Sequence, residues 1–110
     1  MSKLFRSSRD VIIQTNKWDE AIEFYGKILG FPVTHQSPTV VGFETGSFCL
    51  YVEKGTQPGS VFDFLVPNLS DAKRRLVAAG CKIIDENPKI PRCYIQDPFG
   101  LVFNIEENAE

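Results

Sequence analysis

Apolar and polar residues follow one another along the chain in a pattern that predicts short strands and two helices. Residues 10–15 (DVIIQT) are rich in β-branched side chains, which predicts a strand. From Asn16, apolar side chains recur at helical spacing as far as Gly30, where we expect the helix to end. Asn16 and Asp19 resemble a capping pair at the start of this helix. Its predicted apolar face consists of Trp18, Ala21, Ile22, Tyr25, Ile28 and Leu29.

The same order of elements then occurs a second time. Three β-like stretches follow the first helix, at residues 31–36, 39–45 and 47–53. In the second copy, Asn68 and Asp71 repeat the capping spacing before Leu69, Ala72, Leu76, Ala79 and the closing Gly80. Its strands are residues 61–66, 81–86, 92–96 and 101–106, and its loops are residues 87–91 and 97–100. The sequence predicts an α+β fold with two paired β-α-β-β-β modules, at about 9–54 and 60–107, in one domain of residues 1–110.

Strand alternation assigns one side of each strand to the helices and the opposite side to a cleft. The helix-facing residues are Val11, Ile13, Phe48, Leu50, Val52, Phe62, Phe64, Val66, Leu101, Phe103 and Ile105. The opposite side carries Asp10, Ile12, Gln14, Cys49, Tyr51, Val61, Asp63, Leu65, Val102, Asn104 and Glu106. Such a mixture of aromatic, apolar and a few polar groups is typical of a small-molecule cleft. Asn104 stands out, because a neutral amide lies in the middle of a strand.

Two motifs give the chain a family resemblance. The segment AIEFYGKILGF and the segment CYIQDPFGLVFNIE lie about 70 residues apart, within the repeated β-α-β-β-β pattern. Together they resemble motifs of the vicinal-oxygen-chelate superfamily, which includes glyoxalase I, extradiol dioxygenases, fosfomycin-resistance thiol transferases and bleomycin-resistance proteins. The resemblance implies the glyoxalase/bleomycin-resistance fold, in which paired modules form a cupped mixed sheet. It does not by itself imply an activity.

The resemblance also implies where a metal would bind in the superfamily's metal enzymes. Those positions are a His or Gln in the first strand, a His in the fifth strand and a Glu in the last strand. Here they are occupied by Asp10, Val61 and Asn104. Valine has no lone pair to donate, and an amide is a poor ligand for zinc, nickel or iron. The chain has one histidine, His35, so a two-His, one-carboxylate iron site is excluded.

The remaining polar side chains on the predicted cleft side leave three interpretations open. Asp10, Asp63 and Glu106 could hold a relocated hard cation, because such ions accept oxygen ligands alone. They could instead be solvated or bonded to Gln14 and Tyr94. They could also attract a cationic or polar ligand.

Four further side chains carry groups that could take part in binding or chemistry. Cys49 is predicted to point into the cleft with no basic residue assigned near it, so an inert thiol is favoured over a reactive thiolate. Tyr51 and Tyr94 suit either stacking on a ligand or packing in the sheet. His35 has the strand parity of Phe31 and Val33, which favours a strand-end or packed histidine.

Composition narrows the class of protein. A net charge of -2 with no extended basic patch disfavours nucleic acid and membrane partners, and no apolar signal segment is present, so we expect a cytoplasmic protein. Three cysteines without C-x-x-C spacing disfavour both a disulfide framework and a zinc knuckle.

These observations favour a metal-independent small-molecule binder of the bleomycin-resistance type, without a cofactor. The predicted ligand-binding residues are Asp10, Ile12, Gln14, Cys49, Tyr51, Val61, Asp63, Tyr94, Asn104 and Glu106. The alternatives are a glyoxalase-like isomerase or lyase with a relocated divalent metal, and a subunit whose cleft is vestigial. Exposed strand edges and the superfamily resemblance favour a homodimer.

Overall fold

The structure of the chain is a computed structural model that describes residues 5–90 and 92–108. The ends of the predicted domain, residues 1–4 and 109–110, lie outside these ranges, as does Pro91 of the predicted loop. The chain divides into two compact units. We call Arg9–Val61 the N-terminal unit. The C-terminal unit begins at Phe62 and also includes the first described residues, up to Ser8.

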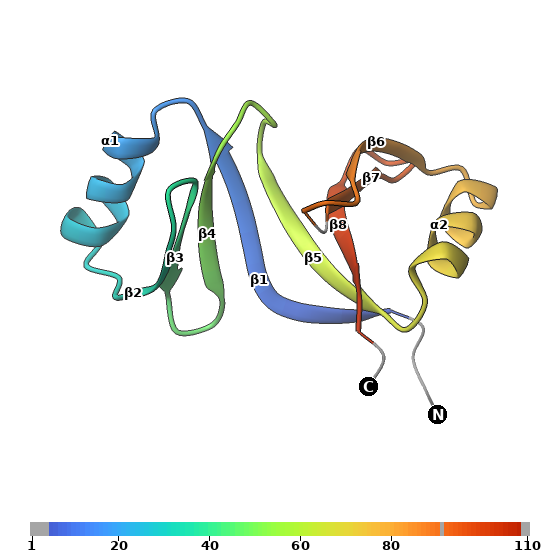
Figure 1. Cartoon of the computed structure of the whole chain (residues 1–110), viewed down its shortest axis with the longest axis horizontal. Coiled ribbons are helices and arrows are strands. Elements are labelled where there is room, and N and C mark those ends of the chain that lie inside the picture. The colour runs from blue at the N-terminus through green and yellow to red at the C-terminus, as the bar shows by residue number, and fades with distance from the viewer. Residues whose placement is uncertain (1–4, 91, 109–110) are drawn as a thin grey trace. The chain divides into compact units, whose positions relative to one another are not determined.

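The N-terminal unit is one β-α-β-β-β module (Figure 1). Its elements are β1 (Arg6–Thr15, of which Arg9 onward belongs to this unit), α1 (Trp18–Glu23), a π-helical segment (Phe24–Ile28), β2 (Val33–Gln36), β3 (Val40–Glu44) and β4 (Cys49–Lys54). Its strands lie in the order β2-β3-β4-β1. β1 runs parallel to β4, whereas β3 is antiparallel to both of its neighbours.

The C-terminal unit repeats this topology. Its elements are β5 (Ser60–Val66, from Phe62 in this unit), α2 (Leu69–Ala78), β6 (Lys82–Asn87), β7 (Arg92–Gln96) and β8 (Val102–Glu107). The strand order is β6-β7-β8-β5, with β8 parallel to β5 and antiparallel to β7. The α+β class and the repeated module predicted from the sequence are therefore confirmed.

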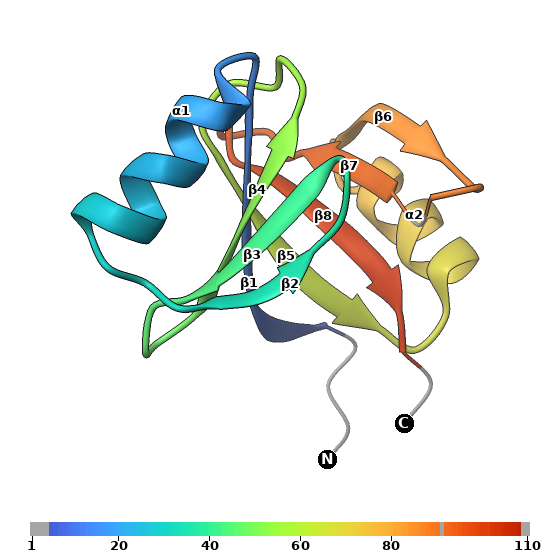
Figure 2. The ribbon, with the colours of Figure 1, turned by 60° about the vertical axis from the view of Figure 1, so that its left-hand side comes forward.

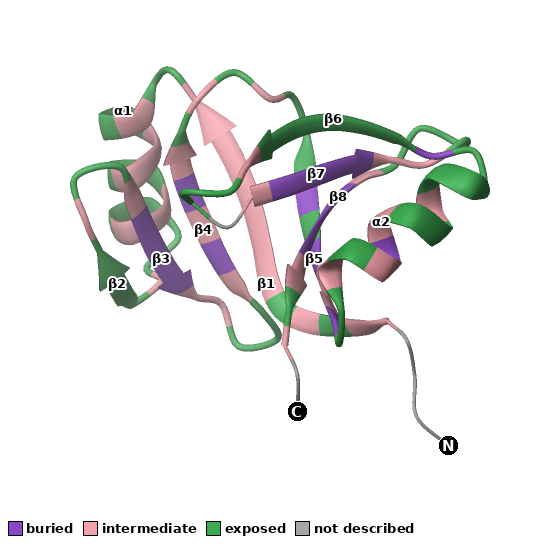
Figure 3. Cartoon of the chain, turned by 45° about the vertical axis from the view of Figure 1, so that its right-hand side comes forward, coloured by how far each residue is buried: buried purple, intermediate pink, exposed green. Residues whose placement is uncertain are grey.

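The core of each unit lies between its sheet and its helix. In the N-terminal unit, Val41, Phe43, Leu50 and Val52 are buried beneath α1, which runs across the sheet (Figure 2). In the C-terminal unit, one side of β5, β7 and β8 packs against α2, and the edge strand β6 is mostly exposed (Figure 3). These C-terminal core residues are Val66, Ala72, Cys81, Cys93, Ile95, Phe103 and Ile105.

Strand alternation is wrong at three predicted core positions. Phe48 and Leu101 are exposed because they precede β4 and β8, and Phe62 is exposed within β5. At the interior positions of the same strands the prediction is confirmed, since Ile13, Leu50, Val52, Phe64, Val66, Phe103 and Ile105 all belong to the helix-facing clusters. Alternation assigns each residue to a side of the sheet. It does not say how far along each strand the helix covers that side.

The two predicted helix caps differ. Asn68 is the N-cap of α2, and its side-chain oxygen accepts the N–H of Asp71 at 2.9 Å. Asn16 is not a cap, because α1 starts one residue later, with Lys17 in the N-cap position. The N–H of Lys17 instead donates to the Thr15 hydroxyl at 3.0 Å. Among the described residues, no helix has the length and apolarity needed to cross a membrane.

The last turn of the first helical segment explains why two predicted core residues are exposed. The segment Phe24–Ile28 is π-helical, and the N–H of Leu29 donates to the carbonyl of Phe24. A π turn bonds residues five apart and so rotates the following side chains away from their α-helical positions. Ile28 is therefore 71% exposed, and Leu29 is exposed as well.

Replacing the two asparagines separately tests the cap assignment. Asn68→Ala should lower the free energy of unfolding by about 1 kcal/mol, because it leaves an N–H at the start of α2 without its acceptor. Asn16→Ala should change stability by less than about 0.5 kcal/mol, since an exposed side chain without such a role contributes little. Urea unfolding of both variants measures the difference. Equal losses would contradict the assignment.

Candidate functional site

Four residues form a row across the side of the N-terminal sheet that faces away from α1. Ile12 lies opposite Tyr51, Tyr51 opposite Gly42, and Gly42 opposite His35. Their neighbours along the strands belong to the core beneath α1, so these positions point to the other side. We call Ile12, Tyr51, Gly42 and His35 the aromatic row.

Gly42 allows the Tyr51 ring to lie against β3. A Cβ atom at Gly42 would stand 2.9 Å from Tyr51 Cε1, which is closer than real side chains approach, and 3.3 Å from His35 Cβ. The rings of His35 and Tyr51 have their centroids 6.3 Å apart and are tilted by 58°. The missing side chain therefore brings two aromatic residues together on one face.

A β-bulge places His35 in this row. The register between β2 and β3 shifts between Val33, which lies opposite the core residue Phe43, and His35, which lies opposite Gly42. The extra residue, Thr34, reverses the side to which His35 would point in a regular strand. His35 is exposed and lies next to the end of β2, so of the two expected positions the packed one is wrong and the strand-end one agrees with the structure.

Next to the aromatic row, Cys49 lies between Asp10 of β1 and Glu44 of β3. Arg9 and Glu44 form a two-pronged ion pair, with Nη2 to Oε2 at 2.8 Å and Nη1 to Oε1 at 3.3 Å. Cys49 Sγ is 3.9 Å from Arg9 Nη1 and 3.5 Å from Glu44 Oε1. The expectation that no basic residue lies near Cys49 is therefore wrong.

Arg9 nevertheless does not make Cys49 a reactive thiolate. Burial raises the pKa of the Cys49 thiol, and the Glu44 carboxylate raises this pKa further, against a smaller lowering by Arg9. The Arg9 hydrogen bond lowers the pKa of Glu44, which keeps the neighbouring charge negative. The thiol is thus favoured in its neutral form, as expected from the sequence.

On the other flank of the aromatic row, Gln14 binds within its own unit. Its Nε2 donates to Glu53 Oε1 at 3.0 Å, and its Oε1 accepts the N–H of Gln57 at 3.1 Å. A Cβ atom at Gly55 would be only 2.1 Å from Gln14 Oε1, so the loop after β4 approaches this amide closely. Gln14 therefore anchors a loop, and both ends of its amide have partners.

In the C-terminal unit, one amide joins three strands. Asn104 of β8 lies opposite both Asp63 of β5 and Tyr94 of β7. Its Nδ2 donates to Asp63 Oδ1 at 2.9 Å, and its Oδ1 accepts the N–H of Cys93 at 2.9 Å. Asp63 is 2% exposed and Asn104 is 4% exposed. These are buried hydrogen bonds.

This geometry explains why an amide stands at position 104. A side chain here must donate to a carboxylate on one side and accept a backbone N–H on the other, and an amide provides both groups. A glutamate or aspartate could accept from Cys93 but would bring a second negative charge against Asp63. Asn104 is therefore required by its neighbours.

The other predicted site residues of this unit lie near Asn104 on the same side. Tyr94 is fully buried, and the Arg92 guanidinium lies 5.1 Å from its ring centroid. Glu106 lies opposite Leu65 of β5. Tyr94 is thus a packed residue, whereas Tyr51 in the N-terminal unit is only half-buried.

The structure gathers the predicted residues in two groups, one in each unit. Asp10, Ile12, Gln14, Cys49 and Tyr51 share one face of the N-terminal sheet, and Asp63, Tyr94, Asn104 and Glu106 share one face of the C-terminal sheet. Val61 is fully buried. Sequence reasoning missed Arg9 and Gly42 and favoured a position outside the cleft for His35. The one signal for the aromatic row was a lone glycine within a strand.

The donor groups do not fit the metal site that the resemblance implies. The amide of Asn104 is engaged at both ends, and Val61 offers no ligand atom. In neither unit do the described residues bring together three or more His, Cys, Asp or Glu side chains in a position to hold a metal ion.

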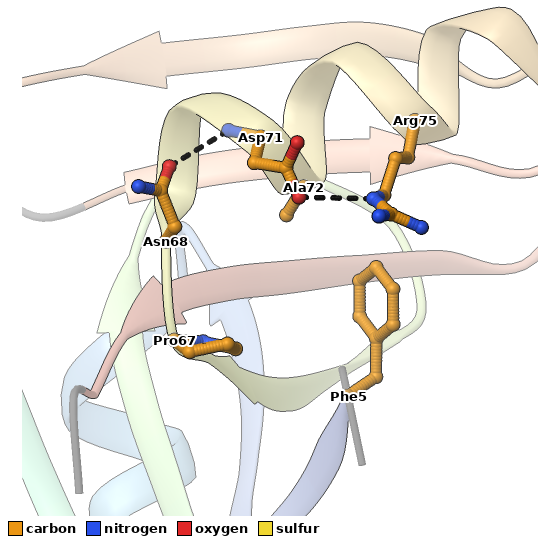
Figure 4. A pocket seen from close by; sticks show the side chains of 6 residues that line it. All are labelled: Phe5, Pro67, Asn68, Asp71, Ala72 and Arg75. Carbon is orange, nitrogen blue, oxygen red and sulfur yellow. Dashed lines mark hydrogen bonds and ion pairs between the residues drawn. The ribbon is translucent and has the colours of Figure 1, made fainter. Parts of the chain in front are cut away.

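Of the cavities in the C-terminal unit, one is too small for a ligand. It lies between Phe5, Pro67 and the first turns of α2, where the Asn68 cap and the Asp71–Arg75 ion pair stand beside it (Figure 4). Its volume is about 10 Å³, which is about the space that a single water needs. A larger cavity, of about 370 Å³, lies between α2, β7 and β8.

Solved structures of other proteins share this fold. A glyoxalase/bleomycin resistance protein/dioxygenase superfamily member from Vibrio splendidus 12B01 matches with a TM-score of 0.68 and 15% identity, over 94% of this chain and 99% of that one. A hypothetical protein from Bacillus halodurans C-125 matches with a TM-score of 0.70 and 12% identity, over 98% and 97%. The Mn(II)-bound glyoxalase from Novosphingobium aromaticivorans matches with a TM-score of 0.61 and 20% identity, over 94% of this chain and 39% of that one.

At these identities the similarity shows the fold alone. No curated protein matches the sequence significantly. A family model described as a glyoxalase-like domain matches residues 10–106, which is most of the chain. This chain therefore belongs to the glyoxalase-like domain family, in agreement with the resemblance carried by its two sequence motifs.

Proposed function

We propose that this glyoxalase-like domain binds a small molecule without a metal ion, in the manner of the bleomycin-resistance proteins. The observation that carries the proposal is the buried pair of hydrogen bonds made by Asn104. The amide stands where the superfamily's metal enzymes have a carboxylate, and both of its polar atoms are used within the protein. A metal ion there would have to compete with the Cys93 N–H for Oδ1, because Oδ1 is the only amide atom with lone pairs to offer.

The face of the N-terminal sheet supports a ligand with an aromatic ring and a positive charge. Tyr51 and His35 offer ring surface in the aromatic row, and Asp10, Glu44 and Glu53 place carboxylates on either side of it. Aromatic faces and carboxylates both attract cations. The Arg9 guanidinium offsets one of these three negative charges.

The C-terminal unit, taken by itself, contains a buried acceptor atom. Asp63 Oδ1 binds Asn104, but no described residue donates to its buried Oδ2. Buried carboxylate oxygens are normally paired, so this atom favours a ligand group that carries N–H or O–H. A ligand group of this kind is compatible with the cationic or polar ligand that the acidic residues of the sequence suggest.

Metal independence is tested by calorimetry on protein purified without chelator. Titration with Zn²⁺ and with Mn²⁺ should show no tight one-to-one binding, and EDTA should leave the melting temperature unchanged, since a ligand that prefers the folded state would raise it. Stoichiometric uptake, or a melting temperature that falls on chelation, would instead favour the isomerase or lyase with a relocated metal.

The role of Asn104 is tested by exchanging the two polar partners. Asn104→Asp should lower the free energy of unfolding by about 3 kcal/mol, because a buried donor is lost and two carboxylates then face each other. Asp63→Asn combined with Asn104→Asp restores one amide and one carboxylate, and should recover most of that loss. Asp63→Asn alone is the control, since its carbonyl still accepts from Asn104. Urea unfolding gives all three values, and no recovery in the double variant would refute this role.

The ligand class is tested with two probes that share a ring and differ in charge. Tryptamine should bind more tightly than indole-3-acetate, because the face carries excess negative charge. Tyr51→Ala should weaken tryptamine binding by about tenfold, and Tyr51→Phe by about twofold or less, since the ring supplies most of the contact. Calorimetry measures the affinities and thermal unfolding measures stability. Equal affinity for both probes would contradict a cationic ligand, and Tyr51→Ala binding like the wild type would contradict the aromatic row.

A further inference from the structure

The cavity of about 370 Å³ in the C-terminal unit lies on the helix side of its sheet. Leu69 and Lys73 of α2 form one wall, and Cys93 and Ile105, both core residues facing α2, form the opposite wall. The other lining residues are Glu86, Asn87, Pro88, Arg92, Glu106 and Glu107. Of the predicted ligand-binding residues, Glu106 is the only one in this lining.

The cavity lies where two strands stop pairing. The register of β7 and β8 ends at Tyr94 opposite Asn104, and the next N–H of β7, from Cys93, goes to the Asn104 side chain. Beyond this point β8 continues to pair with β5 as far as Glu107, whereas β7 pairs with β6 as far as Arg92. The cavity is lined by the ends of these strands.

The polar side chains of the lining already have partners. Lys73 forms an ion pair with Glu86, and Arg92 lies 3.5 Å from Asp85. Glu107 Oε1 accepts the N–H of Leu69 at 2.8 Å, and Asn87 Oδ1 accepts the N–H of Lys89 at 3.0 Å. Glu106 also has an interaction partner. A ligand would therefore meet few unpaired polar groups, and a charged ligand would lose its hydration without compensation.

The wall between these groups is apolar. Leu69, Ile105 and Pro88 contribute hydrocarbon surface, and burial raises the pKa of Cys93, which keeps its thiol uncharged in neutral solution. The volume falls within the range of pockets that hold small ligands, and such pockets are mostly apolar.

We propose that the cavity between α2 and the diverging ends of β7 and β8 is a second binding site, for a small, uncharged and largely apolar molecule such as a substituted benzene. This proposal is independent of the proposed function. The cavity adjoins the core beneath α2, while Asp63 and Asn104 lie on the other side of the same sheet. We expect this cavity to select ligands that fit its shape and carry no charge. The face around the aromatic row, which has carboxylates on either side, is instead expected to select a cation.

The test compares three probes that share a ring. Toluene should shift the NMR signals of the Leu69 and Ile105 methyl groups and the amide of Cys93 in a saturable way. Benzoate and benzylamine should bind at least about tenfold more weakly, because the cavity does not repay the loss of their hydration. Equal binding of all three probes, or shifts confined to other parts of the chain, would overturn the proposal.

A pair of variants on one helix locates the site. Leu69→Trp fills the cavity and should weaken toluene binding by about tenfold or more, since the ligand loses its volume. Val77→Trp is the matched control, because Val77 is 51% exposed on the same helix and does not line the cavity. Its toluene affinity should stay within about twofold of the wild type. Toluene binding that survives in a folded Leu69→Trp variant would overturn the assignment.

A third variant separates this site from the proposed function. Tyr51→Ala should leave toluene binding unchanged, because Tyr51 belongs to the N-terminal unit and does not line the cavity. Loss of toluene binding in this variant would show that the probe occupies the face of the aromatic row, and would refute the second site. Failure of tryptamine to bind would refute the cationic ligand and leave the toluene result unaffected.

Discussion

The hydrogen bonds of Asn104 tie three strands of the C-terminal unit together in its buried interior. One amide donates to an oxygen of a buried carboxylate of β5 and accepts a backbone N–H of β7, and it lies in the strand between them. Each unsatisfied partner would cost about 1–3 kcal/mol if the amide were removed. The position can therefore accept few other side chains unless Asp63 changes with it.

This constraint is separate from the packing that holds each unit together. The stability of each unit comes from the opposite side of its sheet, where Phe43 and Val52 pack against α1, and Phe103 and Ile105 pack against α2. Residues on the remaining side are free to vary as long as their polar groups find partners. Val61 satisfies this condition by having no polar side-chain atom, and Asn104 by binding at both ends.

Hydrophobic periodicity was sufficient to predict the elements, because both helices and the inner strands pack one side against a core, although the edge strands β2 and β6 are exposed. It was insufficient where local geometry breaks the period. The bulge at Thr34 reverses the side of His35, and the π turn before Leu29 rotates the end of the first helical segment into solvent. Neither irregularity has a composition that marks it in a single sequence.

Side-chain partners were harder to predict than sides of the sheet. Alternation placed Asp63 and Asn104 on the same side, but only the register of β5 and β8 brings them opposite each other. Arg9 and Cys49 are separated by 40 residues in the sequence and meet because β1 lies beside β4. The two asparagine caps had identical spacing, and they differ because α1 begins one residue later than the motif suggested.

The same amide also connects the two sides of the C-terminal sheet. Its donor holds Asp63 on the side that faces away from α2, and its acceptor takes the β7 donor next to the helix-side cavity. A substitution at Asn104 that frees the Cys93 N–H removes the contact at which the two strands separate. Such a substitution would therefore change both the partner of Asp63 and the end of β7 that lines the cavity.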